Sequence, residues 1–197
     1  TSEASGSSSS SIKDSSSSSE PTETSSSKSA GGPEFKAVVE TSDLGGINLG
    51  APTESTVTQL KALLGDPTRN EGWNEGCPLD GPDLNERAVS WGSLQVDFVR
   101  DDSSGDGTLA GWTYHVDPVT FAGKAGGPTP EQIVLPSGVH FGTPISEAGT
   151  AVGHAPEDFE LVGVTWITTE TWTLSADALG SSEPLTTAAV PTIFVCE

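Results

Sequence analysis

The chain has 197 residues, a formal net charge of −20, five tryptophans, two cysteines and no methionine. So acidic a surface repels phosphate, which disfavours nucleic-acid binding and electrostatic docking on anionic lipid. The charge keeps an exported protein soluble or, as the alternative, complements a basic partner.

A serine-rich segment opens the chain. Of the first 30 residues 16 are serine, and Ile12 is the one large apolar residue among them. Such a segment cannot bury enough apolar surface to offset the entropy lost when it becomes ordered. We therefore predict a disordered tether over residues 1–36, a first repeat over residues 37–127 and a second repeat over residues 128–197.

Export is suggested by the start of the chain. Because position 1 is not methionine, we expect that a leading segment has been removed or that the sequence is an excerpt. A serine tether at a processed end resembles mature bacterial lipoproteins, whose lipidated cysteine would lie just before Thr1. We therefore expect an extracellular or cell-surface location, with an anchor on an upstream cysteine that this chain does not contain.

A glycine-to-proline pattern occurs twice. Residues 46–52 read Gly-Ile-Asn-Leu-Gly-Ala-Pro, and residues 138–144 read Gly-Val-His-Phe-Gly-Thr-Pro. After each copy, apolar residues spaced at i, i+3 and i+7 predict one short helix. The first helix is expected to end at Gly65 and the second, about one turn shorter, at Gly153.

Strand patterns follow both helices. Alternating apolar residues over 91–98 and 109–116 predict a β-hairpin. Further strands are expected over residues 159–168, 170–176 and 192–196. The sequence therefore predicts an α+β fold, in which two tandem helix-plus-antiparallel-strand repeats form one curved sheet with helices on one face.

The two cysteines are expected to form a disulfide. Cys77 and Cys196 lie 119 positions apart, and neither has the spacing of a metal site. In an exported protein, such a bond would join the last strand to the first repeat. Two buried free thiols are the alternative.

Catalytic and metal-binding signatures are lacking. The three histidines are scattered along the chain, and no serine lies in a Gly-x-Ser-x-Gly elbow. Two of the many acids could still meet in a cleft as a glycosidase-like pair. We expect a protein that is not an enzyme, with no catalytic residue, metal or cofactor.

The aromatic residues supply the candidate binding positions. Trp112 and Tyr114 share one face of an expected strand by period-two alternation. On an open sheet face they would be interface anchors, and otherwise they belong to the core. Trp73, in a polar loop, is either a lid over the helix or an exposed hot spot.

Taken together, these segments resemble a known family over residues 44–197. The tandem glycine-to-proline openings, the short helix ending at Leu64-Gly65-Asp66-Pro67 and the tryptophan-bearing strands resemble the β-lactamase inhibitory protein fold. They also resemble the small outer-membrane-assembly lipoproteins and actinobacterial surface lipoproteins. In the inhibitor, two repeats join into one curved sheet, and its concave aromatic-rich face clasps the enzyme. The resemblance implies binding positions at Trp112, Tyr114, Trp166 and Trp172, although the inhibitor has one disulfide in each repeat.

These observations lead to an expected function. It is a secreted or surface-anchored, non-catalytic module that binds a protein partner, without nucleic acid and with membrane contact only through the inferred anchor. The alternatives are a proteinaceous inhibitor of an extracellular enzyme such as a β-lactamase, and a structural envelope lipoprotein.

Overall fold

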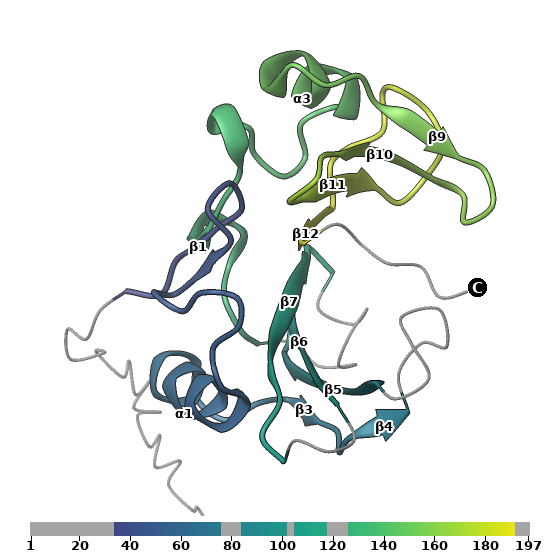
Figure 1. The fold of residues 1–197 in the computed structure, drawn as a ribbon. Coiled ribbons are helices and arrows are strands. Elements are labelled where there is room, and N and C mark those ends of the chain that lie inside the picture. The colour runs from purple at the N-terminus through teal and green to yellow at the C-terminus, as the bar shows by residue number, and fades with distance from the viewer. Residues whose placement is uncertain (1–33, 76–83, 102–104, 118–125, 192–197) are drawn as a thin grey trace, which may run out of the picture. The chain divides into compact units, whose positions relative to one another are not determined.

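The computed structural model describes residues 34–75, 84–101, 105–117 and 126–191 (Figure 1). The chain divides into two units, residues 1–31 and residues 32–197, and every described residue belongs to the second. Phe35, which the predicted tether included, is buried in the core. The rest of the tether and both Cys77 and Cys196 lie outside the described residues, so the disordered tether and the disulfide stay predictions.

Two β-sheets form the described structure. The larger has nine strands in the order β3-β5-β6-β7-β12-β11-β10-β9, with β4 also paired to β5, and its pairs are antiparallel. The smaller has the order β2-β1-β8, with β1 antiparallel to β2 and parallel to β8. The strands are β1 (Ala37–Val38), β2 (Asp43–Leu44), β3 (Arg69–Asn70), β4 (Asn74–Glu75), β5 (Leu84–Trp91), β6 (Leu94–Asp101), β7 (Thr108–His115), β8 (Ile133–Val134), β9 (Glu157–Phe159), β10 (Val164–Thr168), β11 (Thr173–Ala176) and β12 (Thr187–Val190).

The predicted α+β fold of two tandem helix-plus-strand repeats is wrong, because the structure is mostly β-sheet, with one nine-stranded and one three-stranded sheet. The described residues contain two short α-helices, α1 (Thr53–Leu64) and α3 (Ile145–Val152), of 12 and 8 residues. Both lie where the apolar spacing predicted them, and α3 is shorter by the expected turn. The sequence pattern underestimated the amount of β-sheet. Several strands have no alternating apolar pattern, namely β3, β4, β12 and most of β5. Pairing with neighbouring strands, rather than their own propensity, holds them in the sheet.

The two glycine-to-proline segments make corresponding backbone hydrogen bonds. Gly50 N–H donates to the Leu109 carbonyl (2.8 Å), and Gly142 N–H donates to the Leu185 carbonyl (2.9 Å). In return, Leu109 N–H donates to Ala51 O and Leu185 N–H to Thr143 O. Gly50 and Gly142 have φ values of 82° and 86°, a left-handed conformation that favours glycine. The two segments therefore lie in matching surroundings; the division into repeats at residue 127 stays a prediction.

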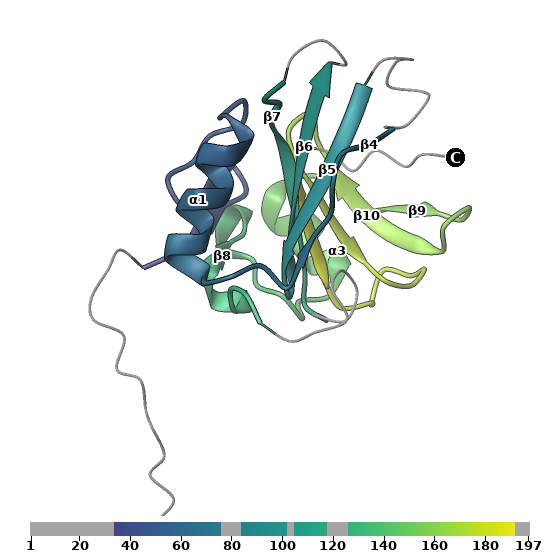
Figure 2. The ribbon, with the colours of Figure 1, turned by 90° about the horizontal axis from the view of Figure 1, so that it is seen from below.

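One face of the large sheet packs on α1, which lies alongside β5, β6 and β7 (Figure 2). The helix contributes Val57 and Leu60 to this core. The Trp91 indole N–H donates to the carbonyl of Gly65 at the end of the helix, at 2.9 Å. Trp112 lies on this face too, opposite Val96, because these two residues pair in the β6–β7 register. The aromatic strand positions found in the sequence thus serve mainly to build the core.

The other face of β6 carries a partly buried carboxylate, Asp97. Burial raises the pKa of Asp97 to about 6, the Glu86 charge adds to the rise, and a hydrogen bond from Gln95 opposes it. The Gln95 Nε2 group donates to Asp97 Oδ1 at 3.0 Å. Opposite Asp97 in the register lies Gly111, and the Val190 carbonyl oxygen and Pro191 Cδ fill the space of its missing side chain, 2.5 and 2.8 Å from where a Cβ would lie. An ionised Asp97 therefore costs the folded state free energy at neutral pH.

Candidate protein-binding surface

Three of the predicted binding aromatics lie in the core. Trp112 and Tyr114 are each 1% exposed, and Trp172 is 7% exposed. The Trp172 ring meets the His154 ring edge-on, with centroids 6.2 Å apart. In this conformation, these three rings offer a partner almost no surface.

Trp73 packs against the β6–β7 hairpin. A Cβ atom on Gly107 would lie 2.3 Å from the Trp73 ring, so the ring rests on bare glycine backbone. The Arg100 guanidinium carbon lies 4.5 Å from the Trp73 ring centroid, a cation–π arrangement. Trp73 is therefore a lid, but over this hairpin rather than over the helix.

Trp166 lies next to an edge of the large sheet and, like Trp73, is partly exposed. It lies on β10, which forms a hairpin with the edge strand β9. The rings of Phe159 and Trp166 stack, with centroids 4.6 Å apart and planes 10° from parallel. They are diagonal neighbours, since Trp166 pairs with Glu157 and Phe159 with Val164.

Two large apolar residues are exposed in the turn of this hairpin. Leu161 is 67% exposed and Val162 is 45% exposed. The Phe159 carbonyl accepts hydrogen bonds from the N–H groups of Val162 (3.3 Å) and Gly163 (3.0 Å), and the positive φ of Gly163, 74°, closes the turn. The backbone that carries the exposed pair is therefore fixed. We call Phe159, Leu161, Val162 and Trp166 the hairpin patch.

Acidic residues surround the hairpin patch. Glu157, Asp158 and Glu160 are exposed, and Asp158 accepts a hydrogen bond of 2.5 Å from the Thr165 hydroxyl. The sequence from residue 125 to residue 197 contains nine Asp and Glu residues and no Lys or Arg. The patch is thus apolar with a negative rim that no lysine or arginine of this half of the chain neutralises.

His115 is the histidine with a carboxylate partner. Its Nε2 lies 3.0 Å from Asp177 Oδ2, and its Nδ1 accepts a hydrogen bond from the Asp117 N–H at 2.9 Å. Because both ring nitrogens are occupied, this histidine ties the end of β7 to the residue after β11 and has no nitrogen left for a substrate. His140 and His154 are exposed.

The described residues contain neither a metal-binding cluster nor a membrane-spanning helix. Within these ranges, no cluster of three or more His, Cys, Asp or Glu side chains could hold a metal ion. No helix there has the length and apolar character to cross a membrane.

Comparison with family models, with curated proteins and with solved structures found no match to this chain. The structure itself therefore carries the functional argument. The hairpin patch was missed from the sequence because residues 159–168 were predicted as one strand. Gly163, between Val162 and Val164, was the signal that could have revealed the turn.

Proposed function

We propose that this protein is a secreted or surface-anchored, non-catalytic module that binds a protein partner through the hairpin patch. The observation that carries the proposal is the exposure of Leu161, at 67%, on a hydrogen-bonded turn beside a stacked aromatic pair. Exposed apolar side chains grouped with an aromatic ring are typical of interface anchors. The acidic rim favours a partner whose surface is basic around an apolar centre.

Substitution at the turn tests the proposal. We expect Leu161→Asp, alone or with Val162→Asp, to weaken partner binding at least about tenfold, because each change places a charge in the apolar centre of the interface. The partner would first be captured from the culture of the producing organism with the chain from Phe35 onward. Its affinity for each variant would then be measured by calorimetry.

A matched control is available at Leu179. This leucine is 45% exposed on the connection between β11 and β12, so Leu179→Asp makes the same chemical change outside the hairpin patch. Binding should survive this substitution, and all variants should keep the wild-type circular dichroism spectrum. Equal affinities for wild type and Leu161→Asp would contradict the assignment of the patch.

A second candidate function is inhibition of an extracellular enzyme such as a β-lactamase. The observation that favours it is the fixed apolar turn at the edge of the sheet, which has the form of an element that enters a cleft. Titration of the protein against β-lactamases and secreted peptidases separates the two functions. Loss of enzyme rate at micromolar protein indicates inhibition, whereas binding without loss of rate indicates a module of the first kind.

A further inference from the structure

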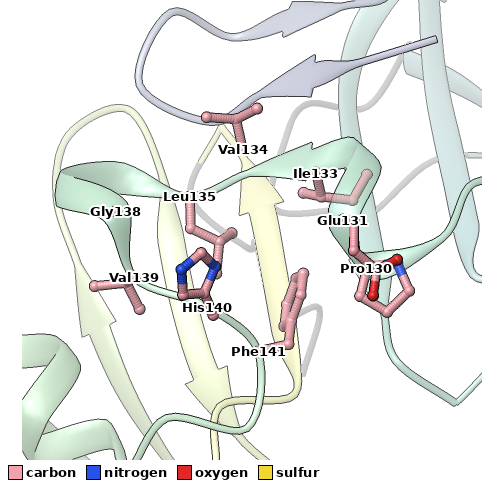
Figure 3. A pocket seen from close by; sticks show the side chains of 9 residues that line it. All are labelled: Pro130, Glu131, Ile133, Val134, Leu135, Gly138, Val139, His140 and Phe141. Atoms are coloured by element: carbon pink, nitrogen blue, oxygen red, sulfur yellow. The ribbon is translucent and has the colours of Figure 1, made fainter. Parts of the chain in front are cut away.

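A pocket of about 370 Å³ lies in the segment between β7 and α3 (Figure 3). Its lining is mainly apolar and comes from one continuous stretch, residues 130–141. The lining residues are Pro130, Glu131, Ile133, Val134, Leu135, Gly138, Val139, His140 and Phe141.

Two turns and a strand pairing shape the pocket. The stretch begins with a 3-10 turn (Pro130–Gln132), continues as β8 against β1, and reverses in a second turn (Pro136–Gly138). Ser137 and Gly138 have positive φ values of 53° and 72°, and the reversal brings His140 back beneath Leu135 (Figure 3). Ile133, Leu135 and Val139 are buried parts of the core, so the apolar wall is rigid.

The charge of the pocket comes from one carboxylate, Glu131. A hydrogen bond from Thr129, together with one from its own backbone N–H, holds the pKa of Glu131 below its usual range, so it is ionised at neutral pH. Burial raises the pKa of Tyr114, and the charge of Glu131 adds to the rise. The lining contains no Lys or Arg, and His140 is its one basic side chain.

We propose that this pocket binds a small organic amine. The apolar body of the ligand would lie against Ile133, Leu135 and Phe141, and its ammonium group would lie at Glu131. The volume falls within the range of small-molecule sites, about 300 to 1,000 Å³. An anionic ligand of the same shape would meet the Glu131 carboxylate without a lysine or arginine to neutralise it, so the pocket selects for positive charge. This site is separate from the hairpin patch and does not depend on the proposed function.

Titration with two ligands that share a phenyl ring tests the charge selection. Phenethylamine should give saturable shifts in the amide resonances of Gly138 and Phe141 of the full chain, with a dissociation constant in the millimolar range. Phenylacetate should bind about tenfold more weakly, because attraction to Glu131 becomes repulsion. No saturable shift with phenethylamine up to about 10 mM, or equal binding of the two ligands, would overturn the proposal.

Two variants test the residues. Glu131→Gln should weaken the binding of phenethylamine about threefold and reduce the difference in affinity between phenethylamine and phenylacetate. The effect is expected to be this small because the Glu131 carboxylate is solvent-exposed. His140→Lys should weaken phenethylamine binding further, because it adds a positive charge to the pocket lining. Outside the pocket, Glu170→Gln makes the same change as Glu131→Gln, and Leu179→Lys introduces a lysine at an exposed position. Both control variants should leave the two affinities unchanged. The proposal would also be overturned if both pocket variants preferred phenethylamine over phenylacetate as strongly as the wild type does.

Discussion

Replacement of Asp97 by asparagine is expected to raise the free energy of unfolding at pH 8 by up to about 3 kcal/mol. The pKa of Asp97 is about 6 in the folded protein, against an ordinary value of 3.8. The folded state therefore holds this proton more tightly than the unfolded chain does. Above pH 6 the carboxylate is ionised in both states, and the folded state carries the cost of its burial. Asparagine removes that cost and can still accept the hydrogen bond from Gln95.

The sign of the effect sets the pH dependence. Between about pH 4 and pH 6 the folded state binds more protons than the unfolded state, so Asp97 lowers the stability of the wild type as the pH rises. The stability of Asp97→Asn should not show this fall between about pH 4 and pH 6. At pH 3.5 the variant and the wild type should have nearly equal stability. Urea unfolding at pH 3.5, 5 and 8 measures both curves.

Asp66→Asn serves as the control for that experiment. The Asp66 side chain is 87% exposed and pairs with Lys61, so its replacement should change stability by less than about 1 kcal/mol at each pH. If Asp97→Asn and the wild type have the same free energy of unfolding at pH 8, burial of the ionised Asp97 carboxylate does not destabilise the folded state.

Gly127→Ala is expected to destabilise the protein by about 4 kcal/mol, near the upper end of single-residue effects. A Cβ atom on Gly127 would lie 1.7 Å from the carbonyl oxygen of Trp91. The contact is reciprocal, because a Cβ on Gly92 would lie 1.9 Å from the carbonyl oxygen of Gly126. The two glycine-containing stretches thus cross backbone to backbone, and the obstruction is not the movable end of a side chain.

Comparison with Gly153→Ala distinguishes the destabilisation caused by the close contact from that caused by backbone strain. Gly127 and Gly153 have φ values of 77° and 78°, but nothing lies within 4 Å of a Cβ on Gly153. The alanine there should cost about 1 kcal/mol, the usual penalty for the left-handed conformation. Thermal and urea unfolding of both variants give the comparison, and equal losses would mean that the Gly127 segment moves aside.

Local patterns were enough to predict some elements of this fold. The i, i+3 spacing of Val57 and Leu60 marks α1 because those side chains face the core in the structure too. Alternation likewise indicates that Trp112 and Tyr114 share a face. Which of the two sheet faces is covered, however, depends on where α1 packs, and that is not a property of the strand itself.

Other features depend on contacts between distant residues. A register shift between Asp97 and Phe98 leaves Ala110 without a partner on β6, so Leu109 and Trp112 both reach the core although they are three residues apart. The central strand β12 has the sequence Thr-Ala-Ala-Val, which shows no alternation. Neither feature has a local signal, because strand pairing decides both.

The candidate sites were hidden from the sequence for a related reason. The exposure of Leu161 follows from the turn that Gly163 closes, and an apolar pattern does not distinguish a turn from a continuous strand. The pocket depends on the positive φ of Ser137, a conformation that serine adopts rarely. Trp166 was among the predicted binding positions, but the sequence pattern could not show which aromatic ring is exposed.

The pairing of β7 with β12 limits which truncated fragments of this protein can fold. The register joins Trp112 to Val190 and His115 to Thr187, so the two halves of the chain meet in the middle of a single sheet. A fragment ending at residue 127 would expose one side of β7, eight residues long, with no Lys, Arg, Asp, Glu or Pro to discourage intermolecular pairing. Such fragments would self-associate rather than fold, so deletion mapping is unsuited to this chain and point substitution in the intact protein is the appropriate tool.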